Sequence, residues 1–589
     1  MRRKRHVKYQ LRTKNYNNIE TTEMALHDLL LDRGIQKPLE WLQPNYTYEH
    51  SPLLFQEMGK SIGLLKSTIA NPEATITVVV DSDLDGYTSG AIILNLLKLI
   101  QRGQDINFIL HPNKEHGIVL EDISEETNLL IVPDAGSSQK AEHLKLLESG
   151  MKIIILDHHE MANDMDYGQY QNNIAIVNSQ EDNYPNHALS GAGVALKFAQ
   201  AYCEKYSIPF PNKLYALAAC GIIADVMDIG DLENKQIVSV GLRYLKEHLF
   251  LYQLIKDTHY NNEEPEPTIK DIGWVIGPNI NAIIRLGTQE QKNIIFKSLV
   301  SPMLLVTSSK NGEEDQEVPV YQEAVRLCKN AKKRQTTAVD KSIRIIENEL
   351  QIKDEDRAII YVDEEQELTF ELSGLIANKL LSQYNRPVLL LRRFQNGNID
   401  ELRGSARGKA VEGLDNLKET LKGLTGVQKA EGHAFAFGVG IDKDMLSEFK
   451  AHLNLVLDKV NFNVNLYLID LIAKYNELNM DMANIVARED IWGHGVDKPL
   501  SLLTDIPTDQ YDYMGNEQQH LKINCGKYDV ILFNVPQLTE RLMQGDKFNL
   551  DAIGEFSVDK SYNVGRLQFV VNDFELKEYV NKTVWDLVF

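Results

Sequence analysis

The sequence predicts a multidomain α/β protein whose first large domain is built on a parallel sheet. The chain has 589 residues, enough for roughly three or four domains of about 150 residues each. Apolar residues make up 43% and charged residues 25%, a globular composition that excludes wholesale disorder. Between residues 72 and 178, short runs that are apolar at every position alternate with helical stretches. Strands covered by helices on both faces have this pattern, so we expect a doubly wound sheet.

The strands of this sheet are expected at residues 76–80, 106–110, 129–132, 153–156 and 175–177. Parallel strands need crossover connections, and the stretches 88–101 and 138–148 supply amphipathic or apolar helices for them. Residues 190 to about 250 are expected to be mostly helical, and a second helical patch surrounds Asn281.

The rest of the chain predicts further domains. A polar loop at 308–318 is followed by a segment, 320–351, that contains no Gly or Pro and predicts a long helix. Residues 356–455 mix strand runs with a helix at 372–383, and residues 456–589 open helically and then give short β-like segments. We therefore expect a helical segment at 1–70, the sheet domain at 71–306, a linker helix at 319–355, a second α/β domain at 356–455, and a small barrel or sandwich, with OB-like topology one option, at 456–589.

Charge and cysteine usage exclude several classes of protein. The 62 Lys and Arg against 84 Asp and Glu give a net charge of −22, which argues against coating nucleic acid through bulk charge but not against a local basic channel. The four cysteines are far apart, so neither a disulfide framework nor a Cys-rich zinc site is expected. Neither a run of 18 apolar residues nor the apolar core of a secretory signal is present, and we expect a cytoplasmic protein without a membrane span.

The first candidate site follows the first strand directly, where Asp81, Asp83 and Asp85 alternate and Gly86 closes the motif. An EF-hand calcium loop begins in the same way, but it needs a bidentate Glu at its twelfth position, which here is Ile92. The flanks are also a strand and a helix rather than two helices. Acids at the end of a strand instead lie at the carboxyl edge of the sheet, where α/β domains bind ligands.

Other apolar runs also end in candidate ligands: Asp134, then Asp157, His158 and His159, and later Asp225. The sheet would bring these carboxylates and at least one imidazole to one edge. Packed acids repel one another unless cations neutralise them, so a metal site is predicted. Oxygen-rich ligation with one imidazole suits Mn²⁺ or Mg²⁺ better than structural zinc. The ligands suffice for two ions with one bridging Asp, an arrangement that hydrolyses phosphate esters.

These motifs resemble the four motifs of the DHH phosphoesterase superfamily, which includes the RecJ exonucleases, the oligoribonucleases with the cyclic-dinucleotide phosphodiesterases, and the manganese pyrophosphatases. Other segments are similar to RecJ in particular and extend the resemblance over nearly the whole chain: 189–197, 278–287, 371–377 with 386–387, 404–407, 432–438, 493–499 and 520–522. The resemblance implies a DHH domain, a linker helix, a DHH-associated domain and a C-terminal OB-like β-barrel. The chain departs from the pattern at Ala135, where a Cys is more common, at Glu431, where a Gly is usual, and at Lys114, where an Arg is usual.

The resemblance also implies roles for individual residues. One metal would be held by Asp81, Asp83 and Asp134, and the other by Asp85, Asp134, His158 and Asp225. Asp157 would orient an imidazole, and His159 would contact the scissile phosphate or protonate the leaving group. The nucleic acid, in particular a terminal 5′ phosphate, would be bound by Lys114, Arg285, Ser405, Arg407, Gly432 and His433. On the OB-like domain, Tyr511 and Tyr513 are candidates for base stacking.

The expected function is a 5′→3′ single-stranded-DNA-specific exonuclease of repair, recombination or replication that releases mononucleotides. It would use two divalent ions, with Mn²⁺ favoured and Mg²⁺ the alternative, act as a monomer, and work with a helicase or single-strand-binding protein. One alternative is an oligoribonuclease or cyclic-dinucleotide phosphodiesterase, although those relatives generally end after the DHH-associated domain. The other is a non-catalytic replication scaffold that binds single-stranded DNA, although every motif acid and histidine is retained here.

Overall fold

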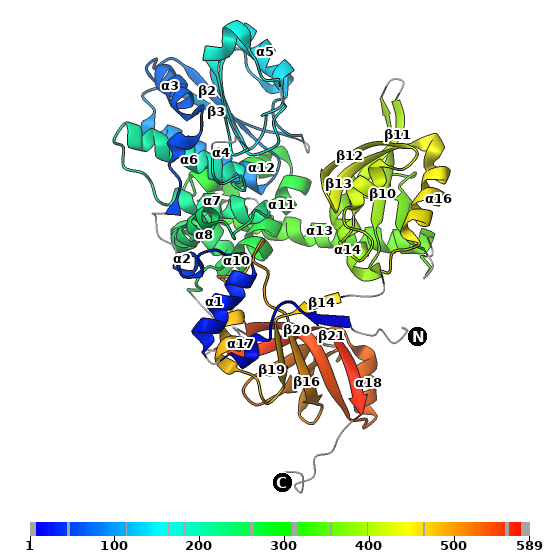
Figure 1. Cartoon of the computed structure of the whole chain (residues 1–589). Coiled ribbons are helices and arrows are strands. Elements are labelled where there is room, and N and C mark those ends of the chain that lie inside the picture. The colour runs from blue at the N-terminus through cyan, green and yellow to red at the C-terminus, as the bar shows by residue number, and fades with distance from the viewer. Residues whose placement is uncertain are drawn as a thin grey trace. The chain divides into compact units, whose positions relative to one another are not determined.

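The computed structural model describes residues 8–19, 21–43, 48–112, 115–162, 164–180, 184–259, 264–308, 316–350, 352–353, 356–396, 399–462, 466–559 and 565–578 (Figure 1). The chain divides into two compact units. One comprises residues 1–10 with 330–467, and the other comprises residues 11–329 with 468–589. Among the described residues, no helix combines the length and apolar character that crossing a membrane requires.

The predicted parallel sheet is confirmed. Its strands have the order β3-β2-β4-β5-β6, and every neighbouring pair is parallel. They are β2 (Thr75–Val80), β3 (Asp105–Leu110), β4 (Thr127–Pro133), β5 (Lys152–Asp157) and β6 (Ile174–Asn178). Because the strands are parallel, all their carboxyl ends lie at one edge, where the motif acids follow them.

Helices cover both faces of this sheet, which explains why its strands are apolar at successive positions. The crossover helices are α4 (Leu84–Ile100) and α5 (Lys140–Glu148). Leu146 and Leu147 of α5 pack with Val132, Ile153 and Ile155 in one buried cluster. Helix α4 contacts strands β2 and β4, and helix α3 (Met58–Ile69) contacts strands β4, β5 and β6. Helix α4 begins four residues before the predicted start at residue 88, because Asp83 caps it.

The predicted helical region follows the sheet. It contains α6 (Gly191–Lys205), α7 (Leu214–Ala224), α8 (Leu232–Tyr244), α9 (Leu249–Lys256), α10 (Ile269–Asp271), the π-helical turn η7 (Ile272–Ile276), α11 (Gly277–Leu286) and α12 (Gln289–Val300). Before the sheet lie α1 (Thr22–Asp32) and α2 (Pro38–Leu42). Helices α6 and α7 pack against α4, so three helices that begin or end near the motif acids share one core.

The predicted long helix is α13 (Val320–Leu350), and the boundary between the two units falls within it. A hairpin of β7 (Leu305–Ser308) and β8 (Gln316–Pro319) precedes it. The unit after residue 330 has a five-stranded sheet of order β12-β13-β11-β10-β9. Its strands are β9 (Ile359–Val362), β10 (Val388–Asn396), β11 (Ile399–Arg407), β12 (Val427–His433) and β13 (Ala436–Asp442), and its helices are α14 (Ser373–Tyr384), α15 (Leu417–Lys422) and α16 (Leu446–Leu457).

The C-terminal part of the chain is a β structure, as predicted. The strands pair in the open order β15-β16-β20-β21-β19-β18-β17, and no pair closes the sheet into a barrel among the described residues. They are β15 (Leu471–Lys474), β16 (Ser501–Pro507), β17 (Tyr511–Met514), β18 (His520–Asn524), β19 (Asp529–Leu532), β20 (Phe548–Asp559) and β21 (Arg566–Glu578), with helices α17 (Met480–Val486) and α18 (Pro536–Met543). The β1 (Lys8–Leu11) and β14 (Leu466–Ile469) strands form a separate pair.

Candidate metal centre

The first motif places its three carboxylates around the start of α4. Asp81 follows β2, Asp83 caps α4 by accepting a 3.0 Å hydrogen bond from the amide of Gly86, and Asp85 lies in the first turn. At Gly86 the backbone passes so close to the preceding turn that a Cβ would lie 2.6 Å from the Cβ and carbonyl oxygen of Asp81. The glycine of the motif is therefore required by close packing, which keeps Asp81 and Asp83 at one end of the strand.

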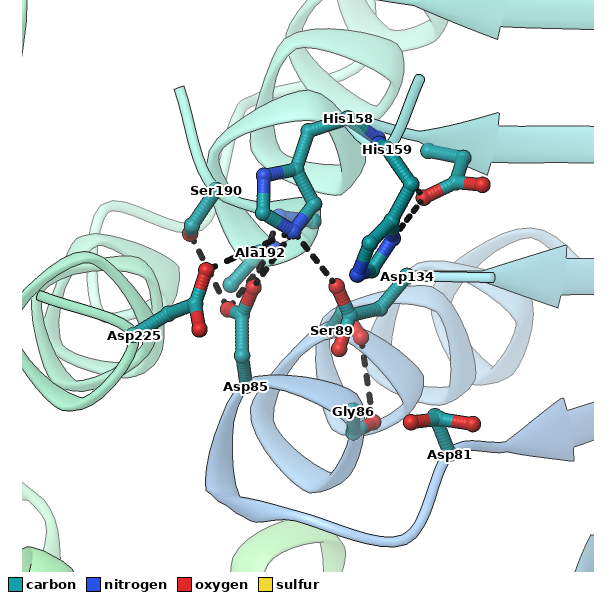
Figure 2. Close-up of polar contacts among 12 residues, drawn as sticks. Asp81, Asp85, Gly86, Ser89, Asp134, His158, His159, Ser190, Ala192 and Asp225 are labelled. Carbon is teal, nitrogen blue, oxygen red and sulfur yellow. Dashed lines mark hydrogen bonds and ion pairs between the residues drawn. The ribbon is translucent and has the colours of Figure 1, made fainter. Parts of the chain in front are cut away.

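Asp85 is held by the N-terminus of a second helix. Its carboxylate accepts hydrogen bonds from Ser190 Oγ at 3.0 Å and from the amides of Gly191 at 2.7 Å and Ala192 at 3.0 Å (Figure 2). These donors belong to the first turn of α6, where backbone N–H groups lack partners within the helix and favour an anion. Three donors thus fix the orientation of this buried carboxylate.

Asp134 occupies the centre of the cluster. It follows β4 with a φ of 68°, in the left-handed region that Asp and Asn enter more readily than other non-glycine residues. Its Oδ1 is buried and accepts no hydrogen bond from the described residues. A Cβ on Gly191 would lie 2.3 Å from this oxygen, so α6 approaches Asp134 by means of a residue without a side chain. A buried carboxylate oxygen without a hydrogen bond is costly unless a cation binds it.

His158 joins this aspartate to the remaining acids (Figure 2). Its Nε2 lies 3.2 Å from Asp134 Oδ1, 3.5 Å from Asp225 Oδ2 and 4.0 Å from Asp85 Oδ2. Asp225 caps the C-terminus of α7, opposite the end of β5 from which His158 comes. The carboxyl edge of the sheet and two helix ends therefore bring together residues up to 140 positions apart in the sequence.

The structure brings the six predicted metal ligands together in two groups. Asp81, Asp83 and Asp134 offer carboxylate oxygens within 4.8 Å of one another, and Asp85, His158 and Asp225 offer a second such set. His158 lies within reach of Asp134, which connects the two groups. Oxygen-rich donor sets of this kind fit Mn²⁺ or Mg²⁺. The unsatisfied Oδ1 of Asp134 is the observation that fits a bound cation best.

The electrostatics of the cluster point to the same conclusion. Burial, aided by the charges of Asp81 and Asp85, raises the pKa of Asp83 to about 6. Burial and the neighbouring Asp85 and Asp83 raise the pKa of Asp225 to about 8, and the pKa of Asp134 is raised well above its usual range by burial and the same repulsion. Carboxylates that resist ionisation in this way become stable anions when a divalent cation is bound beside them.

Asp157 is in a different environment from the other acids. Burial alone would raise its pKa, but hydrogen bonds and charges from His159 and His158 lower it below the usual range. Its carboxylate accepts hydrogen bonds from the amides of Ser137, His158 and His159, and its Oδ1 lies 2.8 Å from Nδ1 of His159. This hydrogen bond raises the pKa of the His159 imidazole to about 9. Asp157 therefore orients both histidines of its motif.

His116 is a residue at this site that the sequence did not reveal. Its Nδ1 lies 2.7 Å from Asp81 Oδ2, and the amide of Gly117 donates a 3.1 Å hydrogen bond to Asp81 Oδ1. The loop that carries them follows β3 and has neither periodicity nor a motif that would connect it to Asp81, 35 residues earlier. The backbone donors of α6 were also missed, because amide groups have no signature in the sequence.

Of the basic residues predicted to bind nucleic acid, Arg285 lies near this centre. It belongs to the last turn of α11, and α11 contacts α4. Burial lowers the pKa of its guanidinium, and the charge of Asp83 opposes that shift. Lys114 lies outside the described residues.

The remaining predicted phosphate-binding residues lie on two strands of one sheet in the other unit. Ser405 and Arg407 lie on β11, and Gly432 and His433 end β12. Ala436 of β13 pairs with both Arg407 and His433, so these two residues share one end of the sheet. The Arg407 guanidinium passes so close to α14 that a Cβ on Gly374 would lie 2.5 Å from its Nη2. Ser405 Oγ is hydrogen bonded to Ser373 Oγ at 2.9 Å.

In the C-terminal sheet, Tyr511 and Tyr513 lie on the edge strand β17, and their rings meet edge to face with centroids 5.4 Å apart.

The segment 493–499, which is also similar to RecJ, contacts the residues that follow helix α7. The amide of Ile229 donates to the carbonyl oxygen of His494 at 3.0 Å, and a Cβ on Gly495 would lie 1.6 Å from Asp228 Oδ1. This turn therefore packs against the residues that follow α7, the helix capped by Asp225.

Comparisons with known proteins agree with this architecture. A model of the DHH family N-terminal domain matches residues 75–222, and a model of the RecJ OB domain matches residues 469–573. The chain is 31% identical over 516 residues to YorK of Bacillus subtilis (strain 168), an SPbeta prophage-derived protein named provisionally as a single-strand DNA-specific exonuclease; the match spans 86% of this chain and 88% of that relative. The single-stranded-DNA-specific exonuclease RecJ of the same organism is 25% identical over 554 residues, spanning 90% of this chain and 65% of the relative.

The fold is also similar to a crystal structure of RecJ in complex with Mn²⁺ from Thermus thermophilus. The TM-score is 0.68 at 21% sequence identity, and the match covers 95% of this chain and 76% of that one. The family models match the two regions that contain the carboxylate cluster and the C-terminal sheet, and the relatives match most of the chain. The chain belongs to the RecJ family of DHH-domain proteins.

Proposed function

We propose that this protein is a metal-dependent exonuclease specific for single-stranded DNA. The observation that carries the proposal is the pair of ligand groups connected through Asp134 and His158 at the carboxyl edge of the parallel sheet. Relatives that match most of the chain are named single-strand DNA-specific exonucleases, and every acid and histidine of the cluster is present here.

Two divalent ions, Mn²⁺ in preference to Mg²⁺, complete the proposed centre. Crystal structures of the Thermus thermophilus relative are described with each of these metals. Asp81, Asp83 and Asp134 would hold one ion, and Asp85, Asp134, His158 and Asp225 would hold the other. Bound there, the ions would activate water near neutral pH and would stabilise charge on the leaving oxygen. Asp134 belongs to the first group and its Oδ1 lies 3.2 Å from Nε2 of His158 in the second, so it is the proposed bridging ligand.

The chain's own acid–base group is His159. Without metal ions, the hydrogen bond to Asp157 raises the pKa of its imidazole to about 9. An imidazole that is 62% exposed beside the ligand groups is suited to contact the scissile phosphate or to donate a proton to the leaving oxygen. Asp157 would position that imidazole from behind and would not contact the substrate.

The proposed polarity is 5′→3′, with release of mononucleotides. Arg285 would bind the strand near the metal centre, and the resemblance assigns a phosphate contact to Lys114, which lies outside the described residues. In the other unit, Ser405, Arg407, Gly432 and His433 would bind the terminal 5′ phosphate or nearby backbone. Two features support this assignment: the Arg407 guanidinium lies at the first turn of α14, and it shares a row of the sheet with His433. Stacking on Tyr511 and Tyr513 would extend the contact along the strand.

We divide the chain into the segments 1–70, 71–306, 319–355, 356–455 and 456–589. Catalysis would occur in segment 71–306, and segments 356–455 and 456–589 would bind the strand. The protein would act as a cytoplasmic monomer in repair, recombination or replication, where a helicase or a single-strand-binding protein would present the single strand.

The proposal is tested by digestion of single-stranded DNA labelled separately at each end, with Mn²⁺ present and a blunt duplex as the control. We expect early release of labelled mononucleotide from the 5′ label only, and an intact duplex. The reaction should stop when a chelator removes the metal.

Other outcomes would assign the protein differently. Release from the 3′ label, or cleavage only of very short oligomers, would indicate an oligoribonuclease or cyclic-dinucleotide phosphodiesterase. Strand binding without any cleavage in Mn²⁺ or Mg²⁺ would indicate a non-catalytic replication scaffold and would contradict the proposal.

A further inference from the structure

A second group of potential metal ligands lies beside the catalytic cluster and shares no residue with it. His111 directly follows β3, Glu115 lies in the next loop, and Asp122 ends the short helix η4 (Leu120–Asp122). One ligand atom from each lies within 4.8 Å of the others. His111 Nδ1 is 4.0 Å from Glu115 Oε2 and 3.8 Å from Asp122 Oδ2. None of these residues belongs to the four DHH motifs.

The imidazole of His111 is buried, and its Nδ1 lacks a hydrogen bond. The side chain is 1% exposed, and Nδ1 has no hydrogen-bond partner among the described residues. The distances to the two carboxylates are too long for hydrogen bonds. Buried polar atoms without partners are rare in native proteins and usually indicate an ion or another group that binds them.

The other ring nitrogen determines the tautomer. Nε2 of His111 lies 2.9 Å from the carbonyl oxygen of Gly117, which can only accept a hydrogen bond, so Nε2 carries the proton. In the neutral imidazole, Nδ1 then presents a lone pair toward two carboxylates. Three electron-rich atoms facing one another repel unless a cation lies between them. A histidine that donates one N–H to a backbone carbonyl and directs its other nitrogen at acids has the arrangement found in metal-ligating histidines.

From this geometry we propose that His111, Glu115 and Asp122 form a third divalent-cation site, separate from the two catalytic ions. One imidazole and two carboxylates favour Zn²⁺ or Mn²⁺ over Ca²⁺ or Mg²⁺, since the imidazole is a ligand for transition metals. Two carboxylates and a neutral imidazole balance a charge of +2. Glu115 and Asp122 are 43% and 37% exposed, so water can complete the coordination.

The proposed cation would stiffen the loop that supports the catalytic cluster. The peptide group of Gly117 connects the two sites, because its carbonyl oxygen accepts from His111 and its amide donates to Asp81. The ammonium of Lys292 already holds the start of the loop through the carbonyl oxygens of His111 at 3.3 Å and Pro112 at 2.8 Å. A cation bound by Glu115 and Asp122 would fix its remainder, and with it His116 against Asp81.

The experiment measures metal stoichiometry in the full-length chain. Protein stripped with a chelator is equilibrated with Zn²⁺, and separately with Mn²⁺, and its metal content is determined by mass spectrometry. We compare the wild type with the double variant Glu115→Gln/Asp122→Asn, in which both changes are isosteric and partly exposed. The matched control is Glu121→Gln/Glu125→Gln, which removes the same charge from exposed positions of the same segment.

We expect the double variant to bind one equivalent fewer than the wild type and the control to bind the wild-type number. Each single variant should weaken this equivalent at least about tenfold, since loss of groups that merely support ligands costs that much. The variant Asp134→Asn should keep the third equivalent, so failure of the catalytic assignment is distinguishable from failure of this one.

Hydrogen exchange supplies a second readout. Metal should slow exchange of the amides at 116–122 in the wild type and in Asp134→Asn, but not in the double variant. Equal metal content in all proteins, or equal loss in the control, would overturn the proposal.

Discussion

Oδ1 of Asp157 lies 2.8 Å from Nδ1 of His159, and the same carboxylate accepts the amides of His158 and His159. One buried aspartate thus contacts both histidines, although only His158 is directed at the proposed metal ligands Asp134 and Asp225. The two histidines of the Asp157-His158-His159 motif therefore have different environments: the side chain of His158 is 9% exposed and that of His159 is 62% exposed.

The variant Asp157→Asn should lower the pKa of His159. In the metal-free protein we expect it to fall from about 9 toward the usual value near 6.5, because the hydrogen bond that the imidazole donates to a charged acceptor is lost. Since the folded-state pKa is raised, the stabilisation by this pair is complete below about pH 6.5 and is lost as the pH rises through 9. Titration of the imidazole by NMR measures the change, with Asp105→Asn, at the exposed start of β3, as the control.

The variant Asp134→Asn should abolish nuclease activity and leave the fold intact. We expect turnover on single-stranded DNA to drop more than about a hundredfold, since even residues that only support metal ligands cost up to that much. In chelator at pH 7 the variant should melt at a higher temperature than the wild type, because the buried, repelled carboxylate is replaced by a neutral amide. Near-normal turnover would refute the role of Asp134 as bridging ligand.

The variant Gly191→Ala should damage the same centre without replacing any of its proposed ligands. Its new Cβ would lie between 2.3 and 2.6 Å from three atoms of Asp134, so α6 or Asp134 must shift. We expect reduced Mn²⁺ affinity and activity. The matched control is Gly59→Ala in α3, where no atom lies within 4 Å of the new Cβ and the gain in helix propensity is about 0.5–1 kcal/mol. Equal activity of the two variants would show that the approach of α6 is not needed.

Acid should destabilise the unit that contains α5 through His143. This side chain is fully buried, its Nδ1 lies 2.8 Å from the Tyr167 hydroxyl, and burial lowers its pKa to about 4. Because the folded-state pKa is lowered, the stabilisation is complete above about pH 6.5 and is lost as the pH falls toward 4, at up to about 1.4 kcal/mol per pH unit. Urea unfolding at pH 7, 6 and 5 should show this slope in the wild type and in His187→Phe, an exposed control, and a shallower slope in His143→Phe.

The variant Arg285→Gln should weaken strand binding through the loss of a phosphate contact. Measured by anisotropy in the inactive Asp134→Asn background, affinity for single-stranded DNA should fall, and the slope of log affinity against log salt should decrease in magnitude by about 0.7. Metal content should not change. Arg243→Gln, an exposed arginine of α8, should leave both affinity and slope unaltered. An unchanged slope in Arg285→Gln would exclude a phosphate contact for that residue.

The parallel sheet and the positions of its acids could be predicted because both signals are local. A strand covered on both faces is apolar at each position, and an acid directly after it must lie at the carboxyl edge. That the proposed ligands Asp81, Asp134 and His158 lie at one edge of the sheet could therefore be expected from the sequence. The order of the strands and the distances between ligands required the three-dimensional packing.

The contacts of the site that could not be predicted are made by backbone groups and by residues in loops. The amides of Gly191 and Ala192 that bind Asp85 have no side chain to identify them, and His116 reaches Asp81 from an irregular loop. For the same reason the turn at 493–495 showed a resemblance but no role, because its packing against Asp228 and Ile229 depends on the absence of a Cβ. Open pairing of the C-terminal sheet likewise depends on contacts between strands far apart in the sequence.

The backbone of Asp134, with its φ of 68°, has an evolutionary consequence. Asn is one of the few residues that adopts this conformation about as readily as Asp, and a single base change converts an Asp codon to an Asn codon. The single substitution Asp134→Asn can therefore remove catalytic activity without straining the backbone and without changing the surfaces that would bind a DNA strand. A single base change is thus enough to convert this protein into one that binds single-stranded DNA but no longer cleaves it.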